Sequence, residues 1–294
     1  MNTAFKKISA LAALSAAFFT TAAVAAINSY TVNFNDNAST YTDNFKRFGD
    51  DTVMTGLAWG AGVGTGGTGG LTVSETAARN LFYRPTAGNN ATSTFDVGGA
   101  AGGTVFSSTL DFKWADISST STTLITAGFT PNNASQTALT SAGALAGSII
   151  RNGNTTVTLR MRNGNADATT LSFDQSALTA NNWYRLSYSL TKTETLNTFN
   201  YTVSLWSIGA DGTATATLFN DGTKNITTSG TVVNSSIYAD PDAFFAYDIR
   251  GGTTGISHVD NFNVGTSAIP EPAHAAMGFA VFALGFVVWG KRRR

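Results

Sequence analysis

The stretch NNWYRLSYSL, residues 181–190, alternates between apolar and polar side chains along most of its length. Tyr184, Leu186, Tyr188 and Leu190 occupy every second position, and arginine or serine separates them. A period of two places these four side chains on one face of a β-strand. The stretch therefore predicts an antiparallel strand with one face in a core and the other toward solvent.

The same alternation recurs along the chain, in SYTVNFND (29–36), LDFKW (110–114), TTVTLRMR (155–162) and FNYTVSLWSI (199–208). Asn152-Gly153 and Asn163-Gly164 flank the third of these segments, and Asn-Gly is the strongest short signal for a hairpin turn. DAFFAYDIR (242–250) is more continuously apolar, which is typical of a central strand. Many short strands with regular turns predict an all-β antiparallel sandwich or jelly roll over residues 27–266.

Composition and charge exclude several classes of function. The 294 residues contain no cysteine, which excludes disulfides, thiol catalysis and cysteine-ligated zinc. Residues 27–266 hold 12 basic and 17 acidic side chains, a net charge of −5. A domain of this charge repels nucleic acid, so no nucleic-acid partner is expected.

The N-terminus carries an export signal. Lys6 and Lys7 precede an apolar run, and the small residues of Ala23–Ala26 follow it. This order is typical of a secretory signal peptide over residues 1–26, which signal peptidase removes.

The C-terminus has three parts in sequence. A linker, residues 267–272, contains Pro270, Glu271 and Pro272, and the two prolines force an extended backbone at the glutamate. Residues 273–290 carry no formal charge and would span about 27 Å as a helix, enough for a bilayer core. Four bases then close the chain and favour a cytoplasmic end for this predicted transmembrane helix: Lys291, Arg292, Arg293 and Arg294.

This tail resembles the PEP-CTERM sorting signal of Gram-negative bacteria. The resemblance implies an exosortase-type processing enzyme as partner, which would recognise residues 270–272. It also implies a body that is exported through the inner membrane into the periplasm, the outer surface or an exopolysaccharide and biofilm matrix. A plain membrane anchor is the alternative that the same apolar segment allows.

The order of strands over residues 181–264 carries a second resemblance, to the concanavalin A-like (laminin G-like) β-sandwich. The W-Y-x-L strand, the Y-x-V strand with its D-G turn and the closing HVDNFNV strand carry it. A carbohydrate-binding jelly roll of another lineage fits the same periodicity. The fold hosts lectins, hydrolases, lyases and inert modules, so the resemblance implies a fold rather than an activity.

Catalysis is not expected. Before the tail, the body has only two glutamates, Glu75 and Glu194, and they are isolated in sequence, whereas a retaining glycosidase needs two carboxylates close together. His258 is the one histidine of the body, and no Gly-x-Ser-x-Gly elbow accompanies it. We therefore expect a protein that is not an enzyme.

The tryptophans are the candidate carbohydrate contacts. Trp59 lies in the glycine run GLAWGAGVGTGGTGG (56–70), which the composition predicts to be a flexible exposed loop. Trp206 falls on the strand face opposite Leu205, toward solvent, and Trp183 is a further candidate. Trp114 is expected in the core with Leu110 and Phe112, on the same alternation.

No cofactor is expected, apart from a structural Ca²⁺ that sandwiches of this type often hold near their first and last strands. Asp36, after the first predicted strand, and Asp260 with Asn261, in the last, are the candidate ligands. The alternative is that they are turn and edge residues.

Three functions follow as expectations. The first is a surface-sorted, non-catalytic protein with a structural or adhesive role in the cell envelope or exopolysaccharide matrix. The second is a lectin-like module that recognises exopolysaccharide, and the third is a divergent polysaccharide-active enzyme.

Overall fold

The computed structural model describes residues 30–35, 38–47, 52–74, 80–83, 94–115, 122–131, 138–251 and 255–267. The predicted signal peptide and the predicted sorting tail, from Ala268 to Arg294, lie outside the described residues. Within the described ranges no helix has both the length and the apolar character needed to cross a bilayer.

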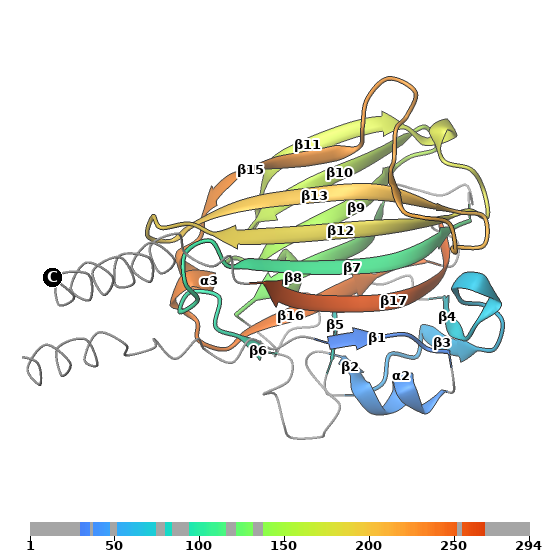
Figure 1. Cartoon of the computed structure of the whole chain (residues 1–294), viewed down its shortest axis with the longest axis horizontal. Helices are drawn as coiled ribbons and strands as arrows, with labels where there is room; N and C mark the ends of the chain where they lie inside the picture. The colour runs from blue at the N-terminus through green and yellow to red at the C-terminus, as the bar shows by residue number, and fades with distance from the viewer. Residues whose placement is uncertain are drawn as a thin grey trace, which may run out of the picture.

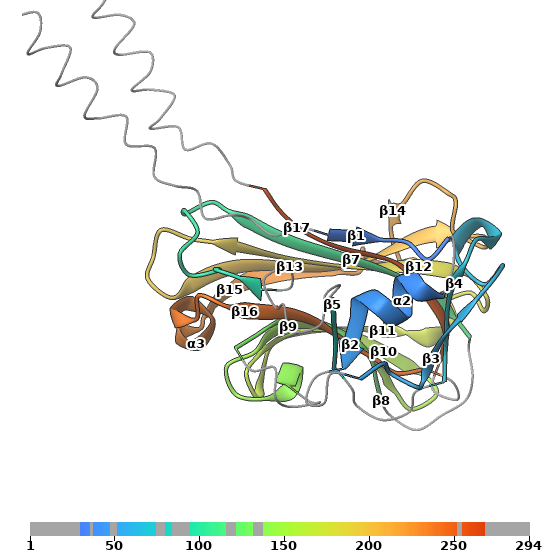
Figure 2. The same cartoon turned by 90° about the horizontal axis from the view of Figure 1, so that it is seen from below.

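Two antiparallel sheets make up the body, and they stack face to face as two layers (Figure 1, Figure 2). In the described residues the first sheet has nine strands: β1 (Tyr30–Val32), β3 (Leu57–Gly60), β4 (Gly70–Val73), β7 (Val105–Trp114), β12 (Trp183–Lys192), β13 (Thr198–Gly209), β14 (Thr217–Leu218), β15 (Thr227–Val233) and β17 (Ile256–Ser267). Its order is β14-β13-β12-β7-β17-β4-β3, with β15 also on β13 and β1 also on β17.

The second sheet, over the same described ranges, has eight strands: β2 (Phe45–Arg47), β5 (Asn80–Tyr83), β6 (Thr94–Phe95), β8 (Thr122–Thr130), β9 (Leu145–Asn152), β10 (Thr156–Asn163), β11 (Ala166–Asp174) and β16 (Ala243–Ile249). Its order is β11-β10-β9-β8-β16-β5-β2, and β6 also pairs with β16. Short helices connect the strands: α2 (Ser39–Asn44), α3 (Ser235–Ala239), η1 (Thr65–Gly67), η2 (Ala138–Thr140) and η3 (Gln175–Ala177).

The predicted alternation of buried and outward side chains is confirmed in the segments for which we predicted it. The apolar residues named for segments 181–190 and 110–114 are all buried, and so are those of β10. The predicted central strand is confirmed as well, because β16 is buried at all seven positions and lies between β8 and β5. Gly153 and Gly164 have φ of 65° and 61°, as the two predicted Asn-Gly turns require.

Aromatic side chains from both sheets fill the space between the layers. Phe245 of β16 is fully buried, and its ring centroid lies 4.9 Å from that of Phe129, 5.3 Å from that of Tyr247 and 6.2 Å from that of Tyr188. Tyr188 belongs to the nine-stranded sheet and the others to the eight-stranded sheet, so this cluster joins the two layers. Burial of such large apolar surfaces is the main stabilising contribution in a chain without disulfides.

The prediction of a flexible exposed loop in the glycine run is wrong. Residues 56–70 are not a flexible exposed loop, because they form β3, η1 and the start of β4. A Cβ atom on Gly69 would lie 2.1 Å from the carbonyl oxygen of Phe34, and one on Gly64 would lie 2.2 Å from the carbonyl oxygen of Gly69. The glycines therefore permit close backbone packing that larger residues would block. This packing holds the glycine run against the nine-stranded sheet.

Candidate functional site

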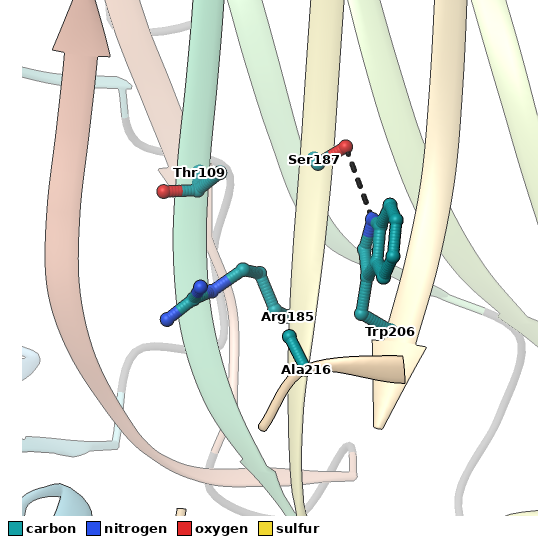
Figure 3. A pocket seen from close by; sticks show the side chains of 5 residues that line it. All are labelled: Thr109, Arg185, Ser187, Trp206 and Ala216. Atoms are coloured by element: carbon teal, nitrogen blue, oxygen red, sulfur yellow. Dashed lines mark hydrogen bonds between the residues drawn. The ribbon is translucent and has the colours of Figure 1, made fainter. Parts of the chain in front are cut away.

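A shallow pocket of about 270 Å³ lies on the outer face of the nine-stranded sheet. Five residues line it, and Figure 3 shows their side chains gathered over β7, β12 and β13: Thr109, Arg185, Ser187, Trp206 and Ala216. The outward side chains follow from the alternation of their strands, because Leu186 and Leu205 point into the core.

Trp206 forms one wall of the pocket and is held in place by a neighbouring strand. Its indole Nε1 donates a hydrogen bond to Ser187 Oγ at 3.3 Å (Figure 3). The side chain is neither buried nor fully exposed. Trp206 is therefore on the solvent side of the sheet, as predicted, and it presents an aromatic surface beside hydroxyl groups.

Arg185 is fixed by a two-pronged ion pair with Asp111 on β7. Its Nε donates to Asp111 Oδ1 at 2.6 Å and its Nη2 to Asp111 Oδ2 at 2.9 Å. The Asp111 side chain is fully buried, whereas the Arg185 side chain is 33% exposed. The hydrogen bonds to Asp111 raise the pKa of the Arg185 guanidinium above its usual value. The guanidinium is thus a rigid donor at the pocket rather than a mobile surface charge.

A β-bulge in β17 places two more polar side chains behind this pair. The pairing of β17 with β7 passes from Asp260 opposite Asp111 to Asn263 opposite Thr109, which leaves two β17 residues against one of β7. Asn261 takes the bulged position with φ of 52°, a left-handed conformation that asparagine adopts more readily than most residues. Its Nδ2 donates to Asp111 Oδ2 at 2.9 Å.

Asp260 anchors the glycine-rich turn to the sheet. Its Oδ2 accepts hydrogen bonds from the backbone N–H and the hydroxyl of Thr65, both at 3.0 Å, and its Oδ1 accepts from the N–H of Asn261. Burial and the nearby charge of Asp111 raise the pKa of the Asp260 carboxyl, although the hydrogen bonds oppose that shift. The N–H of Gly66 also bonds to the carbonyl of Asp211, so the turn meets the hairpin that precedes β14.

The charges around the pocket leave no positive excess. Arg185 pairs with the buried carboxylate of Asp111, and a second buried carboxylate, that of Asp260, lies opposite Asp111 on β17. A ligand at this pocket would therefore meet a fixed hydrogen-bond donor, hydroxyl groups and an aromatic ring, but little attraction for a negative charge. Neutral sugar rings offer the hydroxyl groups and the apolar faces that such a surface can contact.

The other predicted site residues take different places. Trp59 is half-buried against the core, and its indole donates to the carbonyl of Phe34 at 2.8 Å, away from the pocket residues. Trp183 is 2% exposed, so it is not a surface contact; Gly212, in the turn before β14, lies against its ring. Trp114 is in the core, as predicted.

The contacts of the described residues do not test the predicted calcium site. Asp36 lies outside the described residues, and both carboxylate oxygens of Asp260 accept hydrogen bonds from protein N–H or hydroxyl groups. Among the described residues no three histidine or acidic side chains gather as metal ligands. These donors do not form a Ca²⁺ ligand set by themselves, which would need six to eight oxygens, and the calcium site stays a prediction.

His258 and the sorting motif are the remaining residues to which the sequence assigned a possible role. His258 lies within β17, and its Nδ1 is 2.9 Å from the hydroxyl of Ser257. Burial and the charge of Lys113 lower its pKa. Residues 270–272 and the four terminal bases lie outside the described part of the chain, so their predicted roles stay predictions.

Sequence reasoning missed most of the polar network. Arg185 and Ser187 lie in segment 181–190, and its alternation places them on the outward face. The alternation of one strand does not reveal which strand pairs with it. Asp111 and Thr65 gave no signal, because their partners lie 74 and 195 residues away in the chain.

No protein-family model and no curated protein matches the sequence. Among solved structures, the chain is similar to arcelin-5, a lectin-like defence protein from Phaseolus vulgaris, with 12% identity over 83% of this chain and 100% of that chain and a TM-score of 0.45. It is also similar to peanut lectin solved with a nine-residue peptide (10% identity, 82% and 99% coverage, TM-score 0.46) and to endo-1,3-β-glucanase from Streptomyces sioyaensis (10%, 82% and 96%, 0.43).

With TM-scores below 0.5, these likenesses carry no inference about the site. The strand pairing of the chain itself defines an all-β antiparallel sandwich, which confirms the predicted fold class. The concanavalin A-like family stays a prediction.

Proposed function

We propose that this protein is a non-catalytic carbohydrate-binding protein that contacts neutral polysaccharide through the pocket at Trp206. The observation that carries the proposal is the combination of Trp206, the fixed guanidinium of Arg185 and the hydroxyls of Thr109 and Ser187 in one open pocket. A partly exposed aromatic ring beside pre-positioned donors suits a sugar, whose ring has an apolar face and a polar edge.

A non-catalytic role is part of the proposal. The two carboxylates nearest the pocket, Asp111 and Asp260, are fully buried and accept hydrogen bonds from Arg185, Thr65 and Asn261. A glycosidase acid and nucleophile must instead reach the scissile bond of a bound sugar. This arrangement supports binding without hydrolysis.

Substitution of Trp206 tests the proposal. We expect Trp206→Ala to weaken binding to neutral polysaccharides such as dextran or laminarin at least tenfold, because the largest apolar surface of the pocket is lost. Trp206→Phe should retain much of the affinity. Affinity electrophoresis with the polysaccharide in the gel measures the effect.

The matched control is Leu196→Ala, which removes another large apolar side chain, 66% exposed and not among the pocket residues. Its mobility should follow that of the unsubstituted protein. If no neutral polysaccharide retards the unsubstituted protein, or if Trp206→Ala is retarded equally, the carbohydrate-binding proposal is wrong.

A purely structural role in the envelope or matrix is the second candidate. The observation that favours it is that Trp114 and Trp183 are buried and that Trp59 packs against the core, which leaves Trp206 as the single pocket tryptophan among those described. Failure of the binding test above, with the protein still retained in the matrix, would select this alternative.

The proposal includes export and sorting of the protein, on the basis of the sequence of its two ends. The signal peptide over residues 1–26 and the Pro270–Pro272 motif with its apolar segment and basic end support processing by signal peptidase and an exosortase. We expect the intact mass of protein recovered from the cell surface to lack both residues 1–26 and the segment after Pro270. A mass that retains residues 273–290 would mean a permanent membrane anchor instead.

A further inference from the structure

Three arginines gather on the outer face of the eight-stranded sheet, opposite the layer that carries Trp206. Arg160 and Arg162 alternate with the buried residues Leu159 and Met161 of β10, so both point away from the core. Arg250 follows the end of β16 on the same sheet and pairs with Asp248, and the strand pairing through β8 and β9 places Asp248 in the same cross-strand row as Arg160.

Within the described part of the chain, acidic partners do not balance this cluster. Arg160 and Arg162 share a single carboxylate, that of Asp167, with Arg160 Nη1 at 3.3 Å and Arg162 Nε at 4.0 Å from Asp167 Oδ1. Arg250 pairs with the fully buried Asp248, its Nη2 lying 3.0 Å from Oδ2. Three guanidinium groups therefore face two carboxylates in the described part of this surface.

Two of the arginine donors make no hydrogen bond among the described residues. The Nε atoms of Arg160 and Arg162 are buried and make no hydrogen bond with any described residue. Burial lowers the pKa of the Arg160 guanidinium, and the charges of Arg162 and Arg250 act in the same direction. Buried donors on a charged group are costly to leave unpaired, and the described acceptors leave part of the hydrogen-bonding capacity of this cluster unused.

We propose that Arg160, Arg162 and Arg250 form an oxyanion-binding site that takes the carboxylate or sulfate group of an acidic polysaccharide. Each guanidinium offers a planar fork of N–H donors that matches either oxyanion. The side chains of the three arginines are 15%, 14% and 18% exposed, so part of each remains open to solvent. Thr170, opposite Arg160 on β11, adds an exposed hydroxyl for a sugar ring.

The charge of the rest of the body favours a polysaccharide over a nucleic acid. Residues 27–266 carry a net charge of −5, which disfavours binding of a nucleic acid along an extended part of the surface. A polysaccharide with spaced acidic groups can place one oxyanion at the arginines while its neutral parts extend over the exposed side chains of β11.

The test compares binding of the whole chain to polygalacturonate, dextran sulfate and neutral dextran at low ionic strength. We expect Arg160→Gln/Arg162→Gln to weaken binding to an acidic polymer at least tenfold. Binding to neutral dextran should be unchanged, because Trp206 lies on the other sheet. Binding that is confined to polygalacturonate identifies a carboxylate ligand, and binding that is confined to dextran sulfate identifies a sulfate.

Matched variants separate this site from simple charge loss and from the pocket. Lys46→Gln/Lys113→Gln removes two positive charges outside the cluster and should retain acidic-polymer binding, and Trp206→Ala should retain it too. The proposal is overturned if the unsubstituted protein binds neither acidic polymer, if both double variants lose equal affinity, or if duplex DNA binds as tightly. A melting curve of each variant verifies that it folds, which we expect because both arginines point outward.

Discussion

Replacement of Asp111 by alanine is expected to lower the free energy of unfolding by about 3 kcal/mol. The change leaves the guanidinium of Arg185 and the amide of Asn261 without the buried acceptor that both now contact. Loss of one partner from a buried ion pair costs about 3–5 kcal/mol, and the lower end applies because the Arg185 side chain is 33% exposed. Chemical denaturation of the variant measures the loss.

Two comparisons distinguish this effect from ordinary loss of an ion pair. Asp167→Ala breaks an ion pair whose carboxylate is 42% exposed, so it should cost less than Asp111→Ala, because water already reaches that carboxylate. Asp111→Leu/Arg185→Met, which removes both charges together, should cost less than Asp111→Ala alone. A similar small loss for Asp111→Ala and Asp167→Ala would show that the buried network contributes little to stability.

Replacement of Phe245 by alanine is expected to have the largest effect among core substitutions. Phe245 contacts aromatic rings of both sheets, at centroid distances of 4.9 Å to Phe129 and 6.2 Å to Tyr188, and is fully buried. Truncation of a buried phenylalanine removes transfer free energy and leaves a cavity, at a cost of about 3–5 kcal/mol. Thermal and chemical denaturation both report the change.

The neighbouring residue supplies the control. Phe244 points to the opposite side of β16 and packs in a small separate cluster with Ala138, Leu139, Ala146 and Ala246. Phe244→Ala should cost less, because fewer large side chains surround it. Equal losses at the two positions would mean that the ring cluster between the sheets does not dominate the stability of the sandwich.

The strands could be predicted from the sequence because their inner faces alternate strictly. The alternation of segments 181–190 and 199–208 fixed which residues point inward, and it placed Trp206 outside. Such local patterns reflect the two-residue period of a strand and need no knowledge of its neighbours.

The polar network behind the pocket could not be predicted, because it depends on pairing and on one backbone irregularity. The bulge at Asn261 turns its side chain toward Asp111, and no apolar periodicity encodes such a bulge. The glycine run was misinterpreted for a related reason. Composition alone favours a flexible loop, whereas the Thr65–Asp260 hydrogen bonds and the close backbone contacts at Gly64 and Gly69 tie it to the sheet.

The position of β17 determines how the body would respond to mechanical tension. Its twelve residues lie between β7 on one side and β1 and β4 on the other, and its last residue, Ser267, leads into the predicted tail. A polysaccharide held at Trp206 and a pull on the chain after Ser267 would load the sheet between two points along β17, because strand pairing places Trp206 in the same cross-strand row as Asp260, well before Ser267. The load would then run nearly along the strands and stretch many hydrogen bonds in parallel. Such shear loading resists rupture better than loading that breaks one hydrogen bond at a time.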